Sequence, residues 1–149
     1  MSEDHARTVH AFRHASKVEA FARIGFLCLL PVIVYLTTKP GPAIVEERWI
    51  PRTAAKWFDL HDGWKNLAGF GALGWLAFMG WPGGIRQSVA LQIALLCALV
   101  TGLEFLQLAI PTRVFDVSDI INGSAGILIS FCTVLVTRRF LGTVKTGLR

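Results

Sequence analysis

Four apolar stretches decide what this chain can fold into. They lie near residues 18–36, 64–81, 88–110 and 119–137, and a helix needs roughly 20 largely apolar residues to cross a hydrocarbon core. The second stretch is the least apolar, because Asn66 and several glycines interrupt it, although small residues are common where membrane helices pack closely. We therefore predict an all-α, polytopic membrane protein with four transmembrane helices in a compact up-down bundle.

The composition supports this class. The chain is 53% hydrophobic and only 17% charged, which is too apolar for a soluble domain of this size. Its net charge of +5 comes from basic residues that flank the apolar stretches, so anionic lipid headgroups explain it better than nucleic acid does. Cys28, Cys97 and Cys132 fall inside predicted spans without a CxxC motif, so we expect neither a disulfide nor a metal site.

The basic residues also predict an orientation. With the N-terminus inside, nine of the 15 Lys and Arg residues lie on the cytoplasmic side and six outside, which favours cytoplasmic N- and C-termini. Residues 1–17 then form a cytoplasmic N-terminal tail, residues 18–137 the membrane domain, and residues 138–149 a basic cytoplasmic tail. The N-terminal tail has only a faint helical stripe, so an interfacial helix and a disordered segment both remain open.

Proline and glycine mark the predicted ends of the helices. Residues 39–42, Lys-Pro-Gly-Pro, end the first span and begin a loop that reaches about His61, with residues 44–57 at the headgroup level. Residues 81–84, Trp-Pro-Gly-Gly, predict a tight turn before the third span. Pro111 predicts the end of the third span, near Ile110.

Polar side chains gather where three of the predicted helices meet one membrane face. Residues three or four apart share a helix face, so Glu104 and Gln107 lie on one face of the third predicted helix. A chain that crosses the membrane four times in succession places the start of the second helix, the end of the third and the start of the fourth at the same membrane face. The candidate site residues are Asp62, Asn66, Glu104, Gln107, Arg113, Asp116, Asp119 and Asn122.

Glu104 is the most unusual of them, because a carboxylate inside a membrane span is costly and usually faces protein or water. It stands six residues before Ile110, so its Cα lies about 9 Å below the predicted helix end. Arg113 is the nearest cation in the sequence, and its guanidinium could bridge Glu104 to Asp116 or Asp119. Two interpretations remain: a pocket in which Arg113 holds an anionic headgroup, phosphate or carboxylate, and an ion-pair network that only fixes the corner.

Other features have structural explanations. Ser118 or Asp119 is placed to cap the fourth helix, and Gly123 and Gly126 suit close helix packing. No GxSxG or HExxH motif is present, so we assign no catalytic residue, metal or cofactor.

A longer ordered pattern connects the polar residues. It consists of Asp62-x-x-x-Asn66-x-x-x-Phe70-Gly71, Glu104-x-x-Gln107, Pro111-x-Arg113 and Asp119-x-x-Asn122-Gly123-x-x-Gly126. Over about residues 62–126 the chain thus resembles VanZ-like membrane proteins, and nothing like the pattern occurs before Asp59. Many relatives have a histidine where Asn66 stands, and an asparagine can form hydrogen bonds but cannot titrate near neutral pH.

The resemblance implies a small, multi-pass protein of the bacterial inner (cytoplasmic) membrane without an established reaction. The family is associated with low-level resistance to the glycopeptide teicoplanin and with cell-envelope and surface-polysaccharide functions. We therefore expect a non-catalytic envelope accessory or binding protein. Its partners would be membrane lipids, and its extracytoplasmic pocket would take an anionic lipid headgroup or an envelope glycan precursor.

Two alternatives remain open. One is a membrane-embedded hydrolase or transferase that acts on a lipid-linked substrate with Glu104 or Asp119 as general base. The other is a structural subunit of a larger membrane complex.

Overall fold

The computed structural model describes the backbone of residues 3–41, 43–81 and 86–146, and the side chains of residues 17–41, 43–61, 63–81 and 89–139. Within these ranges the regular structure is all helical, as predicted. The elements are α1 (Glu3–Thr38), the short 3-10 helix η1 (Ile44–Glu46), α2 (Arg52–Leu60), α3 (Asp62–Gly80), α4 (Arg86–Gln107) and α5 (Val117–Thr146).

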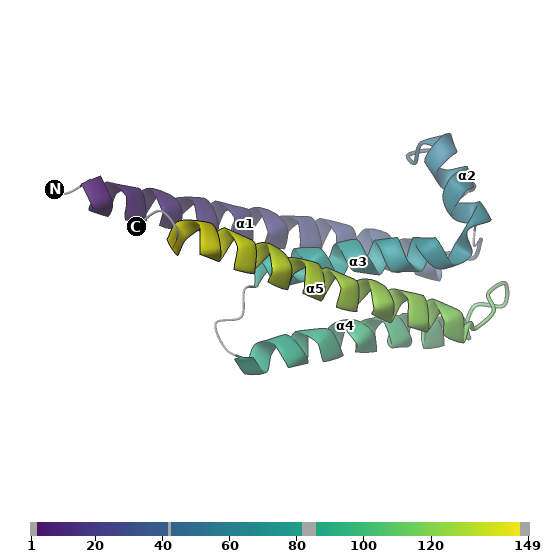
Figure 1. Cartoon of the computed structure of the whole chain (residues 1–149). Helices are drawn as coiled ribbons and strands as arrows, with labels where there is room; N and C mark the ends of the chain where they lie inside the picture. Colours follow the sequence, from purple (N-terminus) through teal and green to yellow (C-terminus); the bar gives the residue numbers. More distant parts are fainter. Residues whose placement is uncertain (1–2, 42, 82–85, 147–149) are drawn as a thin grey trace.

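The four long helices run side by side, and α3 packs between α1 and α5 (Figure 1). The start of α1 and the end of α5 lie at one end of the bundle, whereas α2 and the α4–α5 loop lie at the other (Figure 1). The helix α4 packs mainly against α5, and α2 packs against η1 and the start of α3. The ends of α1 and α4 and the beginnings of α3 and α5 therefore meet at the α2 end.

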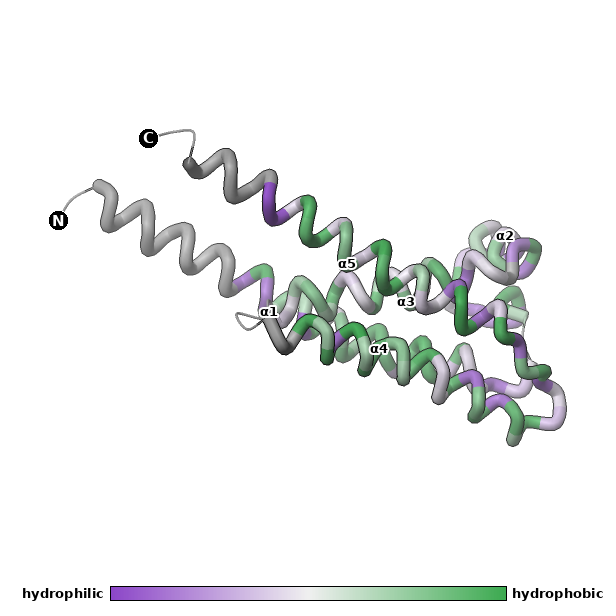
Figure 2. The backbone as a smooth tube through the Cα atoms, turned by 60° about the horizontal axis from the view of Figure 1, so that its bottom comes forward, coloured by the Kyte–Doolittle hydropathy of each residue, from purple (hydrophilic) through white to green (hydrophobic). Residues whose placement is uncertain are grey.

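Three of these helices are long and apolar enough to cross a membrane. The qualifying segments are Lys17–Thr38, Val89–Gln107 and Val117–Arg139. Large apolar side chains such as Phe21, Leu95 and Ile121 are exposed on them, which is the pattern of helices that face lipid. Figure 2 shows hydrophobic residues along these helices and hydrophilic residues near α2 and the α4–α5 loop.

The helix α3 is not among the three segments, because its glycines and its polar residues Lys65 and Asn66 lower its hydropathy. It is nevertheless the most enclosed helix, and it contributes the fully buried Leu73, which shares the core with Ile127 of α5.

Small residues bring α3 and α5 into backbone contact, as predicted for Gly126. A Cβ added at Gly126 would overlap the carbonyl oxygen of Leu67, and one added at Gly74 would lie 3.3 Å from the Cα of Ile127. The hydroxyl of Ser130 donates a hydrogen bond to the carbonyl oxygen of Gly71 at 2.5 Å. The two helices are thus joined through their backbones, which is how small residues serve in membrane bundles.

Two helix boundaries differ from the sequence prediction. The helix α4 ends at Gln107 instead of near Ile110, and the N–H groups of Leu108, Ala109 and Ile110 each bond to the carbonyl three residues earlier. Pro111 restricts the residue before it, so the chain tightens into turns before it reaches the proline. The helix α1 begins at Glu3 and continues through Pro31, so residues 3–17 belong to it.

The predicted first loop contains two helices that were not predicted, η1 and α2. In α2, Ala55 is fully buried while Arg52 and Lys56 are exposed, so this short helix covers the bundle with one face. The helix α3 ends before Trp81, and the tight turn predicted at residues 81–84 lies mostly outside the described residues.

Candidate functional site

A pocket of about 220 Å³ lies at the α2 end of the bundle. It is lined by α1, by the α1–α3 connection, by α3, and by single residues from the end of α4, the α4–α5 loop and the start of α5. Four of the eight predicted site residues line it, namely Asn66, Gln107, Arg113 and Asp119. These four residues come from separate segments, and the predicted order of the helices places them at the same end of the bundle.

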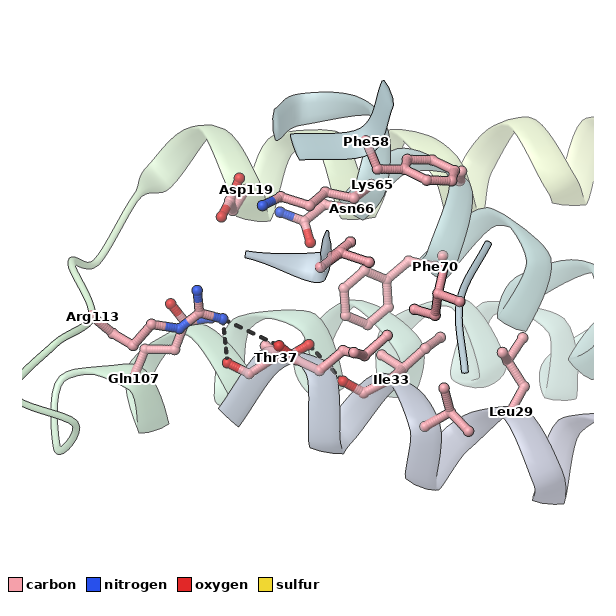
Figure 3. Close-up of a pocket in the computed structure, with 16 residues that line it drawn as sticks. Leu29, Ile33, Thr37, Phe58, Lys65, Asn66, Phe70, Gln107, Arg113 and Asp119 are labelled. Atoms are coloured by element: carbon pink, nitrogen blue, oxygen red, sulfur yellow. Dashed lines mark hydrogen bonds between the residues drawn. The ribbon is translucent and has the colours of Figure 1, made fainter. Parts of the chain in front are cut away.

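The polar lining residues form two groups. Figure 3 shows Lys65, Asn66 and Asp119 close together on one side of the pocket, and Arg113 and Gln107 on the other beside the end of α1. Lys65 was not among the predicted site residues. It was counted only among the basic residues that predict the orientation of the protein in the membrane. Its position next to Asn66 at the start of α3 was the available signal.

Arg113 contacts α1, and this contact was not predicted. Its Nη2 donates hydrogen bonds to the carbonyl oxygens of Thr37 at 2.7 Å and Leu36 at 3.3 Å. The last carbonyls of a helix lack partners within the helix, so the guanidinium satisfies the end of α1. Among the described residues, Arg113 thus bonds to α1 instead of bridging Glu104 to Asp116 or Asp119. Its Nε is buried and has no hydrogen-bond partner within the part of the chain that the structure describes.

Glu104 has a local partner instead. Glu104 is 4% exposed, and its Oε1 accepts a hydrogen bond from the backbone N–H of Asp116 at 2.8 Å. Because α4 ends at Gln107, the Cα of Glu104 lies about 4.5 Å from the helix end, which is half the predicted depth. Glu104 does not line the pocket.

Asp116 caps α5. Its Oδ1 accepts a hydrogen bond from the N–H of Ser118 at 2.8 Å, and α5 begins at Val117, so Asp116 occupies the N-cap position. The prediction of Ser118 or Asp119 as the cap is therefore wrong, because the cap lies two or three residues earlier, but Asp119 does lie in the first turn, where a carboxylate favours the helix dipole. Its side chain is at the pocket.

The two remaining predicted residues, Asp62 and Asn122, lie near the starts of α3 and α5. The carboxamide of Asn122 packs against the first turn of α3, where a Cβ added at Gly63 would lie 2.8 Å from its Nδ2. Asp62 is the first residue of α3, and its side chain lies outside the described residues.

The α1–α3 connection covers the pocket. Ile44, Ile50 and Phe58 of this connection line it, and the carboxylate of Asp59 accepts hydrogen bonds from the N–H groups of Ile44 at 2.8 Å and Val45 at 2.9 Å. Residues 43–60 thus form a cover, which contains η1 and α2.

An ion pair fastens this cover to the end of α1. The Nζ of Lys39 lies 2.9 Å from the Oε1 of Glu47 and also donates to the carbonyl oxygen of Ala43, and Lys39 is only 8% exposed. The hydrogen bond from Lys39 holds the pKa of Glu47 below its usual range. The hydroxyl of Thr112 donates to the carbonyl oxygen of Pro40 at 2.6 Å, which ties the α4–α5 loop to the same corner.

Comparison with known proteins identifies the family. The model of the VanZ/LLP1 family matches residues 26–138, which extend from α1 into α5 and cover most of the chain. The matched range includes the first loop, so the likeness is wider than the stretch of residues 62–126 that carries the sequence pattern. No curated protein and no solved structure matches the chain. The chain therefore belongs to the VanZ/LLP1 family of membrane proteins.

Proposed function

We propose that this protein is a non-catalytic accessory or binding protein of the bacterial cell envelope, and that its pocket binds a lipid headgroup or the lipid-linked part of an envelope glycan precursor. One observation carries the proposal. Asn66, Gln107, Arg113 and Asp119 belong to four different segments, and all four line one pocket. The pocket thus contains side chains that could donate hydrogen bonds to an anion and side chains that could accept one from a hydroxyl. It lies at one end of helices that are long and apolar enough to cross a membrane.

The proposal includes a fourth membrane crossing by α3. This helix has 19 residues, about the length that spans a hydrocarbon core, and it packs between two apolar helices. With four crossings both termini lie on one side of the membrane, and the excess of basic residues near them makes that side cytoplasmic. The pocket then opens at the extracytoplasmic face of the inner membrane.

A supporting role fits Glu104 better than catalysis does. The Oε1 of Glu104 is engaged by the backbone of Asp116, and Glu104 does not line the pocket. A general base must reach the proton that it removes, so Glu104 is poorly placed for that role. An effect on glycopeptide resistance or surface polysaccharide would follow indirectly, through a changed supply or exposure of the bound envelope lipid.

Native mass spectrometry of gently extracted protein tests the proposal. We expect the wild type to retain a lipid that Arg113→Ala releases. Arg48→Ala is the matched control, because Arg48 is an exposed arginine that does not line the pocket. Equal lipid retention by both variants would remove the pocket as the binding site, and turnover of the lipid by purified protein would favour a hydrolase or transferase instead.

A further inference from the structure

The pocket has an apolar arm that extends along α1 away from the polar residues. Leu29, Val32 and Ile33 line this arm from α1, and Ala68 and Gly69 line it from α3. Leu29 precedes Thr37 by eight residues, so the lining continues along α1 for about 12 Å. That direction runs from the bundle end toward the middle of the apolar segment Lys17–Thr38.

Gly69 keeps this arm open. A Cβ added there would find only the Cδ1 of Ile33 within 4 Å, at 3.9 Å, which is an ordinary contact distance. Gly74 and Gly126 differ, because a Cβ at either would press on the backbone of the neighbouring helix. Helix packing thus requires a glycine at 74 and 126 but not at 69, where the missing side chain leaves space that belongs to the pocket.

The opposite end of the pocket carries charged side chains. Two cations, Lys65 and Arg113, and one carboxylate, Asp119, line it. Among the described residues, the Nε of Arg113 is a buried donor without a hydrogen-bond partner, and leaving a buried donor unsatisfied is unfavourable. An oxyanion beside Arg113 would accept hydrogen bonds from the guanidinium that lines the pocket, and a hydroxyl on the same ligand could donate to Asp119.

We propose that the occupant is a lipid phosphate, whose single hydrocarbon chain lies in the apolar arm and whose phosphate is bound at Arg113. This inference rests on the proposed function and specifies its ligand. The cavity of about 220 Å³ is smaller than the roughly 300–1,000 Å³ of pockets that enclose drug-sized molecules. It therefore holds the phosphate and the adjoining part of one chain, while any glycan attached to the phosphate stays outside.

Three probes of defined chemistry separate the contributions of charge and chain. Monododecyl phosphate carries both groups, inorganic phosphate carries only the anion, and dodecanol carries only the chain. Binding of each to the full-length protein is measured by titration in detergent with native mass spectrometry. We expect saturable binding of monododecyl phosphate that is at least about tenfold tighter than that of either partial probe.

Variants then assign the two ends of the ligand. Gly69→Leu fills the apolar arm, and Gly102→Leu is its matched control, because a Cβ at Gly102 meets nothing within 4 Å. Arg113→Gln removes the cation, and we expect it to weaken binding at least about tenfold, as loss of a charged hydrogen bond does. Gly69→Leu should weaken binding to a similar degree, whereas Gly102→Leu should leave it unchanged. Thermal unfolding of each variant verifies that it is folded, and Gly69→Ala replaces Gly69→Leu if the latter is not.

Each failure has a distinct meaning. If Arg113→Gln weakens binding but neither Gly69 variant does, the polar pocket stands and the chain-binding arm is refuted. If a Gly69 variant weakens binding and Arg113→Gln does not, the phosphate assignment is refuted. If no variant changes binding, both this inference and the proposed function fall.

Discussion

The Oε1 of Glu104 accepts a hydrogen bond from the backbone N–H of Asp116 at 2.8 Å, and this bond ties the end of α4 to the start of α5. Asp116 in turn caps α5 through the N–H of Ser118. One buried carboxylate thereby fixes the loop that carries Arg113 to the pocket, so Glu104 supports the site without lining it.

Removing this acceptor is expected to destabilise the protein. Glu104→Ala removes the part-buried hydrogen bond to the N–H of Asp116, and a typical hydrogen bond contributes about 0.5–1.5 kcal/mol to stability. Glu104→Gln keeps an oxygen acceptor of the same reach, so it should lose less. Thermal unfolding in detergent, followed by circular dichroism, compares the two variants. Equal loss in both would mean that the charge of Glu104, and not its acceptor oxygen, holds the corner.

Gly126 offers a sharper test of the bundle. Gly126→Ala forces a methyl group against the carbonyl oxygen of Leu67 and the N–H of Gly71, and neither backbone can move without separating α3 from α5. Overpacking of this kind costs about 1–3 kcal/mol, and we expect a value near the upper end. Gly102→Ala is the control with open space around its Cβ, and its midpoint of thermal unfolding should match or exceed that of the wild type. A stable Gly126→Ala protein would contradict the close α3–α5 contact.

The cover over the pocket should loosen in acid. A carboxyl whose pKa is lowered in the folded state stabilises that state at pH values above its usual pKa of about 4.3. This stabilisation is lost as the pH falls from that value through the lower pKa of the folded state. The pKa of Glu47 is lowered in this way, chiefly by the hydrogen bond from Lys39. Below about pH 4 we therefore expect the ion pair to weaken and residues 43–60 to open.

Hydrogen exchange measured by mass spectrometry checks this prediction. Peptides that contain Ile44 and Val45 should exchange faster in the wild type as the pH falls, after correction for the intrinsic rate. Glu47→Gln should exchange rapidly at every pH and show no transition, because it cannot form the pair. A transition that persists in Glu47→Gln would assign the effect to another carboxyl.

Sequence patterns predicted the long helices and the meeting of polar residues because both follow from periodic or nearly local features. Apolar runs define α1, α4 and α5, and the order of the helices alone brings Asn66, Gln107 and Asp119 to one end. The partner of Arg113 was not predictable in this way. The carbonyls of Leu36 and Thr37 lie more than 70 residues away, and the end of a helix carries no side-chain signal that attracts an arginine.

The cover escaped prediction for a different reason. The helix α2 has only nine residues, and isolated helices of that length are marginal in water. It forms because Ala55 is buried by tertiary packing and Asp59 fixes the preceding turn. The boundary of α4 shows the same limit, since Pro111 indicated that the helix must end but not that three tighter turns would precede the proline.

The orientation and the fourth crossing can be tested together with single cysteines. In a background without Cys28, Cys97 and Cys132, we would place one cysteine at Arg48 in the cover or at Lys17 near the opposite end of the bundle, both of which are exposed. A membrane-impermeant maleimide applied to intact cells should label Arg48→Cys, and Lys17→Cys should react only after permeabilisation. The reverse pattern would invert the protein and place the pocket on the cytoplasmic face.

A third cysteine tests α3 directly. Trp81 follows the last residue of α3 and is 39% exposed, so Trp81→Cys reports the side to which this helix leads. If α3 crosses the membrane, Trp81→Cys behaves like Lys17→Cys and is protected in intact cells. Labelling of Trp81→Cys together with Arg48→Cys would mean that α3 begins and ends on one side. Only three helices would then cross the membrane, so the two termini would lie on opposite sides. The basic residues near the termini would no longer all lie on the cytoplasmic face.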